Sequence, residues 1–156
     1  MRTNWKSGGG GGGGQGTGGG GGGWDGGAMT LVDDLASAAA TGNTAGVEDL
    51  LRRGADVNGV NNYGRTPLQV MMMGSTPVAR LLLARGSRPN VADSSTGTTP
   101  LHDAAREGFL DTVRVLLEFK ADPGARDHFN SQPVDLARQS GHDNVVEFLE
   151  FLKEAN

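Results

Sequence analysis

The sequence predicts an all-α solenoid, a stack of helix-turn-helix repeats, and three observations support this fold class. Thr66-Pro67-Leu68 recurs 33 residues later as Thr99-Pro100-Leu101, and Pro133-Val134 follows after another 33. Apolar residues with helical spacing follow these segments. Glycines stand where short helices have to end. A period of this length is typical of stacked units, none of which buries a core alone.

The third repeat explains why two helices form in each unit. Thr99 is a good N-cap, and Pro100 suits the first helical position, where a missing donor costs nothing. Gly108 can adopt the left-handed conformation that ends the first helix. Helical spacing of apolar residues predicts a second helix from Phe109 to Leu117. Because a T-P-L-H string with this period is the signature of the ankyrin repeat, we expect four such repeats with hairpin loops.

The first and last repeats follow the same scheme. Leu35–Ala39 aligns with Leu101–Ala105 at an offset of 66, and a second helix is expected over residues 47–53. In the last repeat, the first helix begins at Pro133 and the second covers residues 145–152. We expect this repeat to form the C-terminal cap, with a polar outer face.

The second repeat departs from the 33-residue period. Gly74 arrives one residue early relative to Gly108, and Leu82-Leu83 precedes Leu116-Leu117 by 34 residues rather than 33. One residue is therefore missing between the two helices, and the loop at residues 93–98 restores it with one extra. Because a β-branched residue and three methionines replace the alanine-rich turn, we expect the first helix of this repeat to be cut to about one turn.

The domain organisation follows from composition. Of the 27 glycines, 16 lie between Gly8 and Gly27, and such a segment cannot bury enough apolar surface to offset the entropy of ordering it. We expect residues 1–29 to form a disordered Gly-rich tail and residues 30–156 to form one ankyrin-repeat domain. The expected repeats cover residues 31–62, 63–95, 96–128 and 129–156.

Composition also bounds the function. The net charge of −4 argues against nucleic-acid binding, and no apolar run approaches the length of a membrane span. Cysteine is absent, and His128 and His142 lack the spacing of metal ligands. No nucleophile has a suggestive context, so no catalysis and no cofactor are expected. No secretion signal is recognisable, and we expect a soluble monomer in the cytoplasm and nucleus.

Two segments of the sequence distinguish this chain from a general ankyrin-repeat protein. They are L-Q-V-M-M-M-G at Leu68–Gly74 and H-D-A-A-R-E-G-F-L-D-T at His102–Thr112. Residues 31–155, which include both segments, resemble the ankyrin-repeat inhibitors of the cyclin-D-dependent kinases. With four repeats, the chain is similar to the shorter members of that family. The Gly-rich tail departs from that family, as does Lys120, which replaces a glycine that normally ends a helix.

The resemblance implies a function that the residues alone do not. Such inhibitors bind monomeric cyclin-dependent kinases four and six beside the ATP cleft. They distort the nucleotide site allosterically and weaken cyclin docking. The expected outcome is less phosphorylation of the retinoblastoma protein, arrest in G1 before DNA synthesis and a tumour-suppressor-like role. The alternative is a general ankyrin-repeat adaptor with another partner, which predicts a regular first helix in repeat two.

Several residues are candidates for partner contact. Asp103, Arg106 and Glu107 share one face of the predicted helix, being three and four residues apart. From the residues alone, an acid in the first turn paired with Arg106 is an ordinary solvated pair. The resemblance implies that Asp103 is the central contact and pairs with a kinase arginine. Asp93 either forms a turn, as expected for the equivalent Asn61, or contacts the kinase.

Other candidates lie at the junctions between helices. Gln69, Met71 and Met72 either fill the core or contact the partner. Because one turn cannot bury three consecutive residues, we expect at least one methionine to be exposed. Phe109 is expected in the core with some exposure at its rim. Asp111 either caps the second helix, the favoured interpretation, or reaches the partner. His102 is expected to bond within its own turn, and a four-repeat stack is expected to be marginally stable.

Overall fold

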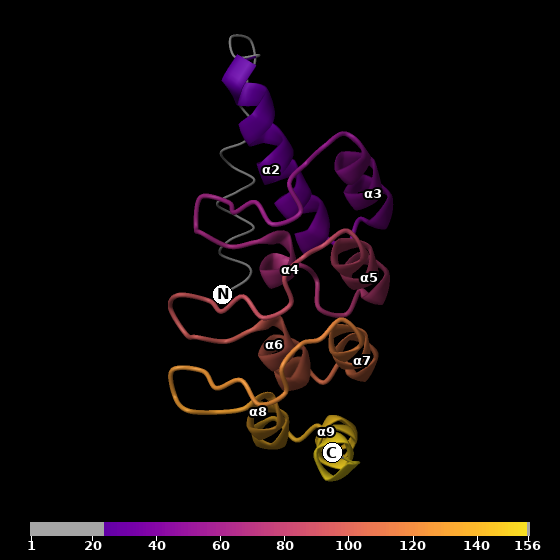
Figure 1. The fold of residues 1–156 in the computed structure, drawn as a ribbon, viewed down its shortest axis with the longest axis vertical. Helices are drawn as coiled ribbons and strands as arrows, with labels where there is room; N and C mark the ends of the chain where they lie inside the picture. Colours follow the sequence, from indigo (N-terminus) through magenta and orange to yellow (C-terminus); the bar gives the residue numbers. More distant parts are fainter. Residues whose placement is uncertain (1–23, 156) are drawn as a thin grey trace.

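The computed structural model describes residues 24–155. Within this range eight helices form four consecutive pairs stacked along the long axis of the molecule (Figure 1). No strand occurs among these residues, in agreement with the predicted all-α solenoid. The pairs are α2 (Trp24–Ala40) with α3 (Thr44–Arg52), α4 (Pro67–Val70) with α5 (Thr76–Ala84), α6 (Pro100–Glu107) with α7 (Leu110–Glu118), and α8 (Pro133–Gln139) with α9 (Asp143–Ala155).

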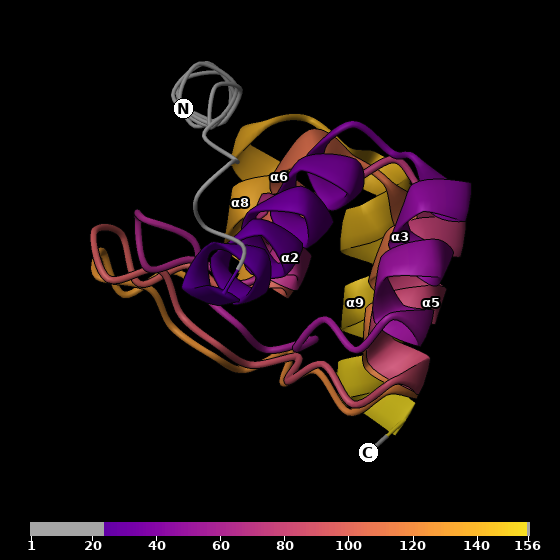
Figure 2. The same ribbon diagram turned by 90° about the horizontal axis from the view of Figure 1, so that it is seen from above.

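The helices form two layers, and the hairpin loops extend from one edge. Viewed along the stack, the first helices of the pairs lie in one row and the second helices in another (Figure 2). Contacts run along each row, from α6 to α8 in the first and from α5 to α7 in the second. The three hairpin loops superimpose in this view, so the loops also form a stack.

The core lies between the two rows. Leu35, Leu68 and Leu101 occupy equivalent positions in three first helices and are completely buried. Four valines, one from each second helix, are buried to the same degree; they are Val47, Val78, Val113 and Val145. Ala104 and Ala105 are also fully buried, and their small side chains allow neighbouring repeats to approach closely.

The N-terminal boundary of the domain differs from the prediction. The expected tail reaches residue 29, but α2 begins at Trp24. Residues 24–29 are therefore helical in the structure. Gly26 and Gly27 are poor helix formers, at about 1 kcal/mol each relative to alanine, but extending an existing helix avoids the cost of nucleation. The rest of the expected tail, residues 1–23, lies outside the described residues.

Helix ends follow the expected chemistry with one exception. Gly54 and Gly86 follow α3 and α5 with φ of 98°, the left-handed conformation that glycine adopts without strain. After α7 the equivalent residue is Lys120, which has φ of 76°. A side chain in this conformation costs about 1–2 kcal/mol. The third repeat therefore carries backbone strain that the first two do not.

Candidate functional site

The first helix of repeat two is short. Helix α4 has four residues, and Met71 at its C-terminal end is extended, with ψ of 158°. The N-caps Thr66 and Ser75 are nine positions apart, whereas Thr99 and Phe109 in repeat three are ten apart. One residue is therefore missing between the helices of repeat two.

Neighbouring repeats satisfy the backbone that this break leaves unpaired. The Met72 N–H donates to the Ala39 carbonyl of repeat one at 2.9 Å. The Met73 carbonyl accepts from the buried Thr112 hydroxyl of repeat three at 2.6 Å. Since buried backbone groups are costly when unpaired, both bonds hold the broken segment in a defined conformation.

The three methionines of this segment have different environments. Met71 and Met73 are buried, at 0% and 2% exposure, whereas Met72 is 48% exposed. The expectation of at least one exposed methionine is therefore confirmed. The sequence also predicts Met71 as a candidate for partner contact, and this prediction is wrong, because Met71 is extended at the end of α4 and its side chain is buried in the core.

Gln69 is also occupied by a structural role. Its Oε1 accepts from the Thr66 N–H at 2.7 Å, and the Thr66 side chain accepts from the Gln69 N–H at 3.3 Å. This reciprocal capping box starts α4. Because Gln69 is only 8% exposed, we correct its assignment from a partner contact to a cap of repeat two.

Helix α6 presents a charged face, as the spacing predicts. Ala104 and Ala105 point into the core, and Arg106 and Glu107 are exposed. The Arg106 guanidinium donates to Asp103 Oδ1 at 2.8 Å. The Asp103 side chain is only 14% exposed, against 43% for Arg106. The Asp103 carboxylate is thus partly desolvated, whereas its Arg106 partner is well solvated.

His102 fixes the orientation of α6. Its Nδ1 accepts from the Thr99 N–H at 3.1 Å, which confirms the expected bond within its own turn. With Nδ1 as an acceptor, the proton resides on Nε2, which donates to the Ser131 carbonyl at 2.8 Å. His102 is completely buried. It therefore locks α6 to the loop that leads into repeat four.

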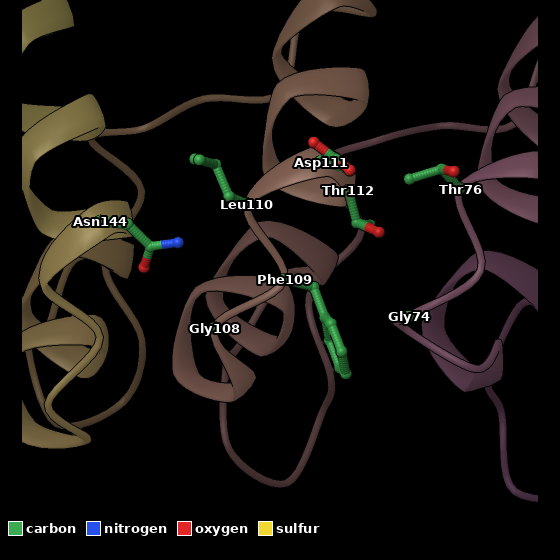
Figure 3. Close-up of a pocket in the computed structure, with 8 residues that line it drawn as sticks. All are labelled: Gly74, Thr76, Gly108, Phe109, Leu110, Asp111, Thr112 and Asn144. Atoms are coloured by element: carbon green, nitrogen blue, oxygen red, sulfur yellow. The ribbon is translucent and has the colours of Figure 1, made fainter.

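A groove opens at the start of α7. Its volume is about 350 Å³, and it lies where repeats two, three and four meet (Figure 3). Phe109 projects into it and is 41% exposed, so the prediction of a core position is wrong. Phe109 stands at the N-cap of α7, outside the helical face that packs on the core. The lining residues are Gly74, Thr76, Gly108, Phe109, Leu110, Asp111, Thr112 and Asn144.

Asp111 does not cap α7. The N-cap is Phe109, which makes no side-chain capping bond, and Asp111 lies in the first turn of the helix. Its carboxylate is exposed beside the groove. An acid at this position interacts favourably with the helix dipole without needing a direct bond. The favoured capping interpretation is therefore corrected, and Asp111 is accessible to a partner.

Side chains at the helix junctions cover glycines of the preceding repeat. A methyl group added at Gly42 would lie 2.9 Å from Met72 Sδ. One added at Gly74 would lie 3.2 Å from the Phe109 ring, and one at Gly108 would lie 2.5 Å from His142 Nδ1. These contacts place the exposed side chains of Met72 and Phe109 in fixed positions on the surface.

Asp93 performs the predicted turn chemistry. Its Oδ1 accepts from the Ser95 N–H at 2.8 Å, and its Oδ2 accepts from Arg65 Nε at 2.8 Å. Partial burial opposes ionisation, but these hydrogen bonds outweigh it and hold the pKa of Asp93 below its usual value. Asn61 and Asp127 accept from the backbone of their own loops in the same way. Asp93 therefore joins the first two hairpin loops.

Comparison with known proteins decides the family. The model for ankyrin repeats, described as three copies, matches residues 35–127 and again residues 74–155. Human cyclin-dependent kinase 4 inhibitor B is 55% identical over 117 residues, which cover 75% of this chain and 85% of the relative. The chain belongs to the ankyrin-repeat inhibitors of cyclin-dependent kinases. Human cyclin-dependent kinase inhibitor 2A is 54% identical over 75% of each chain. The rat kinase 4 inhibitor B is 53% identical over 74% of this chain and 88% of the relative.

In this member of the inhibitor family, six of the candidate residues are at least partly exposed. Met72 follows α4, Asp103, Arg106 and Glu107 lie on α6, and Phe109 and Asp111 lie at the start of α7. We call these six residues the contact face. Gln69 and Met71 lie beneath it, and Asp93 lies apart from it in the second hairpin loop. The contact face carries more carboxylates than guanidinium groups, which suits a basic partner surface.

Sequence reasoning missed three exposed aromatic residues of this inhibitor, namely Phe151 of α9, which is 65% exposed, and two residues in hairpin loops. Tyr63 is 51% exposed and Phe129 is 82% exposed, each in a hairpin loop. They stand two residues after Asn61 and Asp127, whose side chains accept from their N–H groups. The signal was present in the sequence, because apolar residues in a turn held by such bonds point to solvent.

The inhibitor shows no sign of a metal or membrane site in its described part. Residues 24–155 contain no group of three histidine, cysteine, aspartate or glutamate side chains placed to hold a metal ion. Over the same residues, no helix has the length and apolar character needed to cross a membrane.

Proposed function

We propose that the chain inhibits cyclin-dependent kinases four and six by binding the monomeric kinase through the contact face. The observation that carries the proposal is the identity of 55% with a protein named as an inhibitor of cyclin-dependent kinase 4, over 75% of this chain. Extension to kinase six rests on the family resemblance of the L-Q-V-M-M-M-G and H-D-A-A-R-E-G-F-L-D-T strings.

The geometry of the contact face supports binding of a basic protein surface. Asp103 is the central contact in the proposal, since its partly desolvated carboxylate offers a strong ion pair to an arginine of the kinase. Arg106, which is 43% exposed, can be displaced at little cost, because exposed ion pairs contribute little. Met72 and Phe109 supply exposed apolar area, and methionine adapts readily to a partner.

The proposed mechanism is allosteric. The inhibitor binds beside the ATP cleft and prefers the kinase conformation in which the nucleotide site is distorted. It thereby shifts the kinase population away from the form that docks cyclin D. A rigid surface is needed for this, and the bonds of His102 and of the broken segment in repeat two supply it. The physiological result is negative regulation of the G1/S transition.

The alternative of a general ankyrin adaptor has less support. It predicts a regular first helix in repeat two, whereas α4 has four residues. It also gives no reason for an exposed methionine beside a charged helix. An adaptor would bind another partner and leave cyclin-D-dependent kinase activity unchanged, and this outcome separates the two functions.

The test is binding to purified monomeric kinase four, followed by a kinase assay with cyclin D. Asp103→Asn should weaken binding by about 2–5 kcal/mol, since it leaves a buried kinase cation without its partner. The same change should cost the inhibitor about 1 kcal/mol or less of its own stability, because asparagine keeps an oxygen acceptor and the Arg106 side chain is well solvated.

The matched control is Asp135→Asn in repeat four. Asp135 also lies in the first turn of its helix and pairs with an arginine three residues on, at 3.4 Å from Arg138. The Asp135→Asn substitution should leave kinase binding unchanged. Equal losses in both variants would refute the role of Asp103, and absence of binding by the parent chain would refute the proposed function.

A further inference from the structure

Three of the six prolines follow a threonine, and the three Thr-Pro pairs differ in the structure. Thr66 and Thr99 are N-caps of α4 and α6. Each is only 4% exposed, and each hydroxyl accepts from the backbone N–H three residues on. These two threonines serve the repeat scaffold, and their hydroxyls are not accessible from solvent.

Thr76-Pro77 is placed differently. The N-cap of α5 is Ser75, whose hydroxyl accepts from the Val78 N–H at 3.3 Å. Thr76 is therefore the first residue of the helix, and its hydroxyl is not needed for capping. Among residues 24–155, no hydrogen bond of the Thr76 hydroxyl is present. Thr76 is half-buried and Pro77 is exposed.

The Thr76 side chain lines the groove at the start of α7 (Figure 3). Its methyl carbon points toward Asp111 and Thr112 on the opposite wall, and its hydroxyl oxygen lies beside the start of α5. The preceding segment, from Met71 to Ser75, is not helical. A threonine that lines a groove, an exposed proline and a non-helical preceding segment are features that suit an enzyme that modifies the pair.

We propose that Thr76 is a phosphate-acceptor site for a proline-directed protein kinase. Proline lacks an N–H, so a kinase pocket that offers no acceptor at this position admits proline and penalises other residues. In the transfer, Thr76 Oγ1 forms a bond to the γ-phosphorus of ATP. The bond from that phosphorus to the β–γ bridging oxygen breaks, ADP leaves, and the hydroxyl proton passes to the base of the kinase.

The folded chain can accommodate the product. A phosphate on the first residue of α5 lies where the helix dipole favours negative charge, and α5 has nine residues. The Ser75 cap stays in place, and the groove offers about 350 Å³. The phosphate also adds negative charge on the wall facing Asp111, which makes the groove strongly anionic.

This site shares its groove with Phe109 and Asp111 of the contact face, and this part of the inference rests on the proposed function. A kinase bound over these residues covers Thr76 as well. Binding of the partner and modification of Thr76 are then mutually exclusive, so phosphate on Thr76 would release the inhibitor from its kinase by occupying the groove.

The experiment incubates the full chain with ATP and a purified mitogen-activated protein kinase, and maps phosphate by mass spectrometry. We expect modification of Thr76 alone in the folded chain. The heat-denatured chain should be modified at Thr66 and Thr99 as well, which provides an internal control. Pro77→Ala should reduce the rate at Thr76 at least tenfold while leaving the unfolding midpoint nearly unchanged.

Two results would overturn the inference. One is an unmodified Thr76 in the folded chain under conditions that modify it in the denatured chain. The other is equal modification of the Pro77→Ala variant. A Thr76→Val chain should incorporate no phosphate when folded, and incorporation that persists at another residue would also contradict the assignment.

A second arm uses the complex with a catalytically inactive kinase four. Protection of Thr76 in the complex supports the shared groove, and unhindered modification there overturns it. If no complex forms, the proposed function fails, whereas modification of Thr76 in the isolated chain still stands on its own result.

Discussion

The first helices of repeats two and three begin alike and end differently. Each starts from a capping box, formed by Thr66 with Gln69 in repeat two and by Thr99 with His102 in repeat three. Helix α6 then runs for eight residues and stops at Gly108, whose φ is 82°. Helix α4 runs for four residues and stops at Met71, which is extended. A good start signal therefore does not set the length of a helix.

The difference lies in where the backbone finds its partners. In repeat three the C-cap Gly108 donates to carbonyls of its own helix. In repeat two the broken segment bonds to Ala39 in the repeat before it and to Thr112 in the repeat after it. The conformation of repeat two is thus a property of the stack, as nearest-neighbour stabilisation of repeat proteins implies.

The largest expected effect concerns the methionines of repeat two. Met71→Ala should lower the free energy of unfolding by about 2–5 kcal/mol, because it opens a cavity in a fully buried position. Met72→Ala is the matched control, since its side chain is 48% exposed, and it should change stability by about 0.5 kcal/mol or less. Urea unfolding measures both, and similar losses would contradict the burial pattern.

The next prediction removes the bond from repeat three to the broken segment. Thr112→Val keeps the shape of a buried side chain but leaves the Met73 carbonyl unsatisfied, at a cost of about 1–3 kcal/mol. Thr112→Ser keeps the hydroxyl and should cost about 0.8 kcal/mol, the value of one buried methylene. Amide exchange at Met72 should accelerate in the valine variant alone. Acceleration in both variants would show that packing, not the hydrogen bond, holds the segment.

Repeat three carries strain at its other end, and relieving it should stabilise the protein. Lys120→Gly removes a left-handed cost of about 1–2 kcal/mol and adds about 0.5–1 kcal/mol of glycine flexibility in the unfolded chain. A net gain near 0.5–1 kcal/mol is expected in thermal unfolding. Gly86→Ala is the reverse experiment in repeat two. Gly86→Ala should lower the free energy of unfolding, because Gly86 has φ of 98°. No atom lies within 4 Å of the added methyl group, so the loss would come from backbone strain and not from a clash.

The smallest effect is the pH dependence of the bond between the first two hairpin loops. Burial opposes ionisation of Asp93, but bonds from Arg65 and Ser95 keep its pKa below 3.8. The carboxylate therefore contributes stability above that pH, and the contribution is lost as pH falls through the lowered pKa. The difference in melting temperature between the parent and Asp93→Asn should shrink from pH 7 toward pH 2. A constant difference would exclude the ionised bond as its cause.

Much of the fold follows from periodic features of the sequence. The Thr-Pro helix starts and the glycine stops act within a single repeat, so local chemistry fixes them. The Asx-type turns at Asn61, Asp93 and Asp127 are local for the same reason. The start of α2 at Trp24 was missed, because helix extension depends on packing further along the chain.

The candidate site was less predictable, because it depends on contacts between repeats. Asp103, Arg106 and Glu107 share a face through helical spacing alone. The burial of Met71 and the exposure of Met72 depend on bonds to Ala39 and Thr112, which no single repeat contains. Phe109 resembles a core residue by spacing, yet it precedes the helix and lies on Gly74 of the neighbouring repeat.

The glycine contacts at the helix junctions give the stack a direction. Met72 covers Gly42, Phe109 covers Gly74 and His142 covers Gly108. Each of repeats two to four therefore packs one side chain on a glycine of the repeat before it. Loss of a C-terminal repeat would expose a glycine of the remaining stack. Loss of an N-terminal repeat would instead leave a side chain without the glycine on which it packs. At Gly141 no described atom lies within 4 Å of an added methyl group. Gly141, the equivalent glycine of the last repeat, is therefore uncovered. The stack ends in an uncovered glycine on its C-terminal side, whereas its N-terminal repeat has a glycine that the next repeat covers.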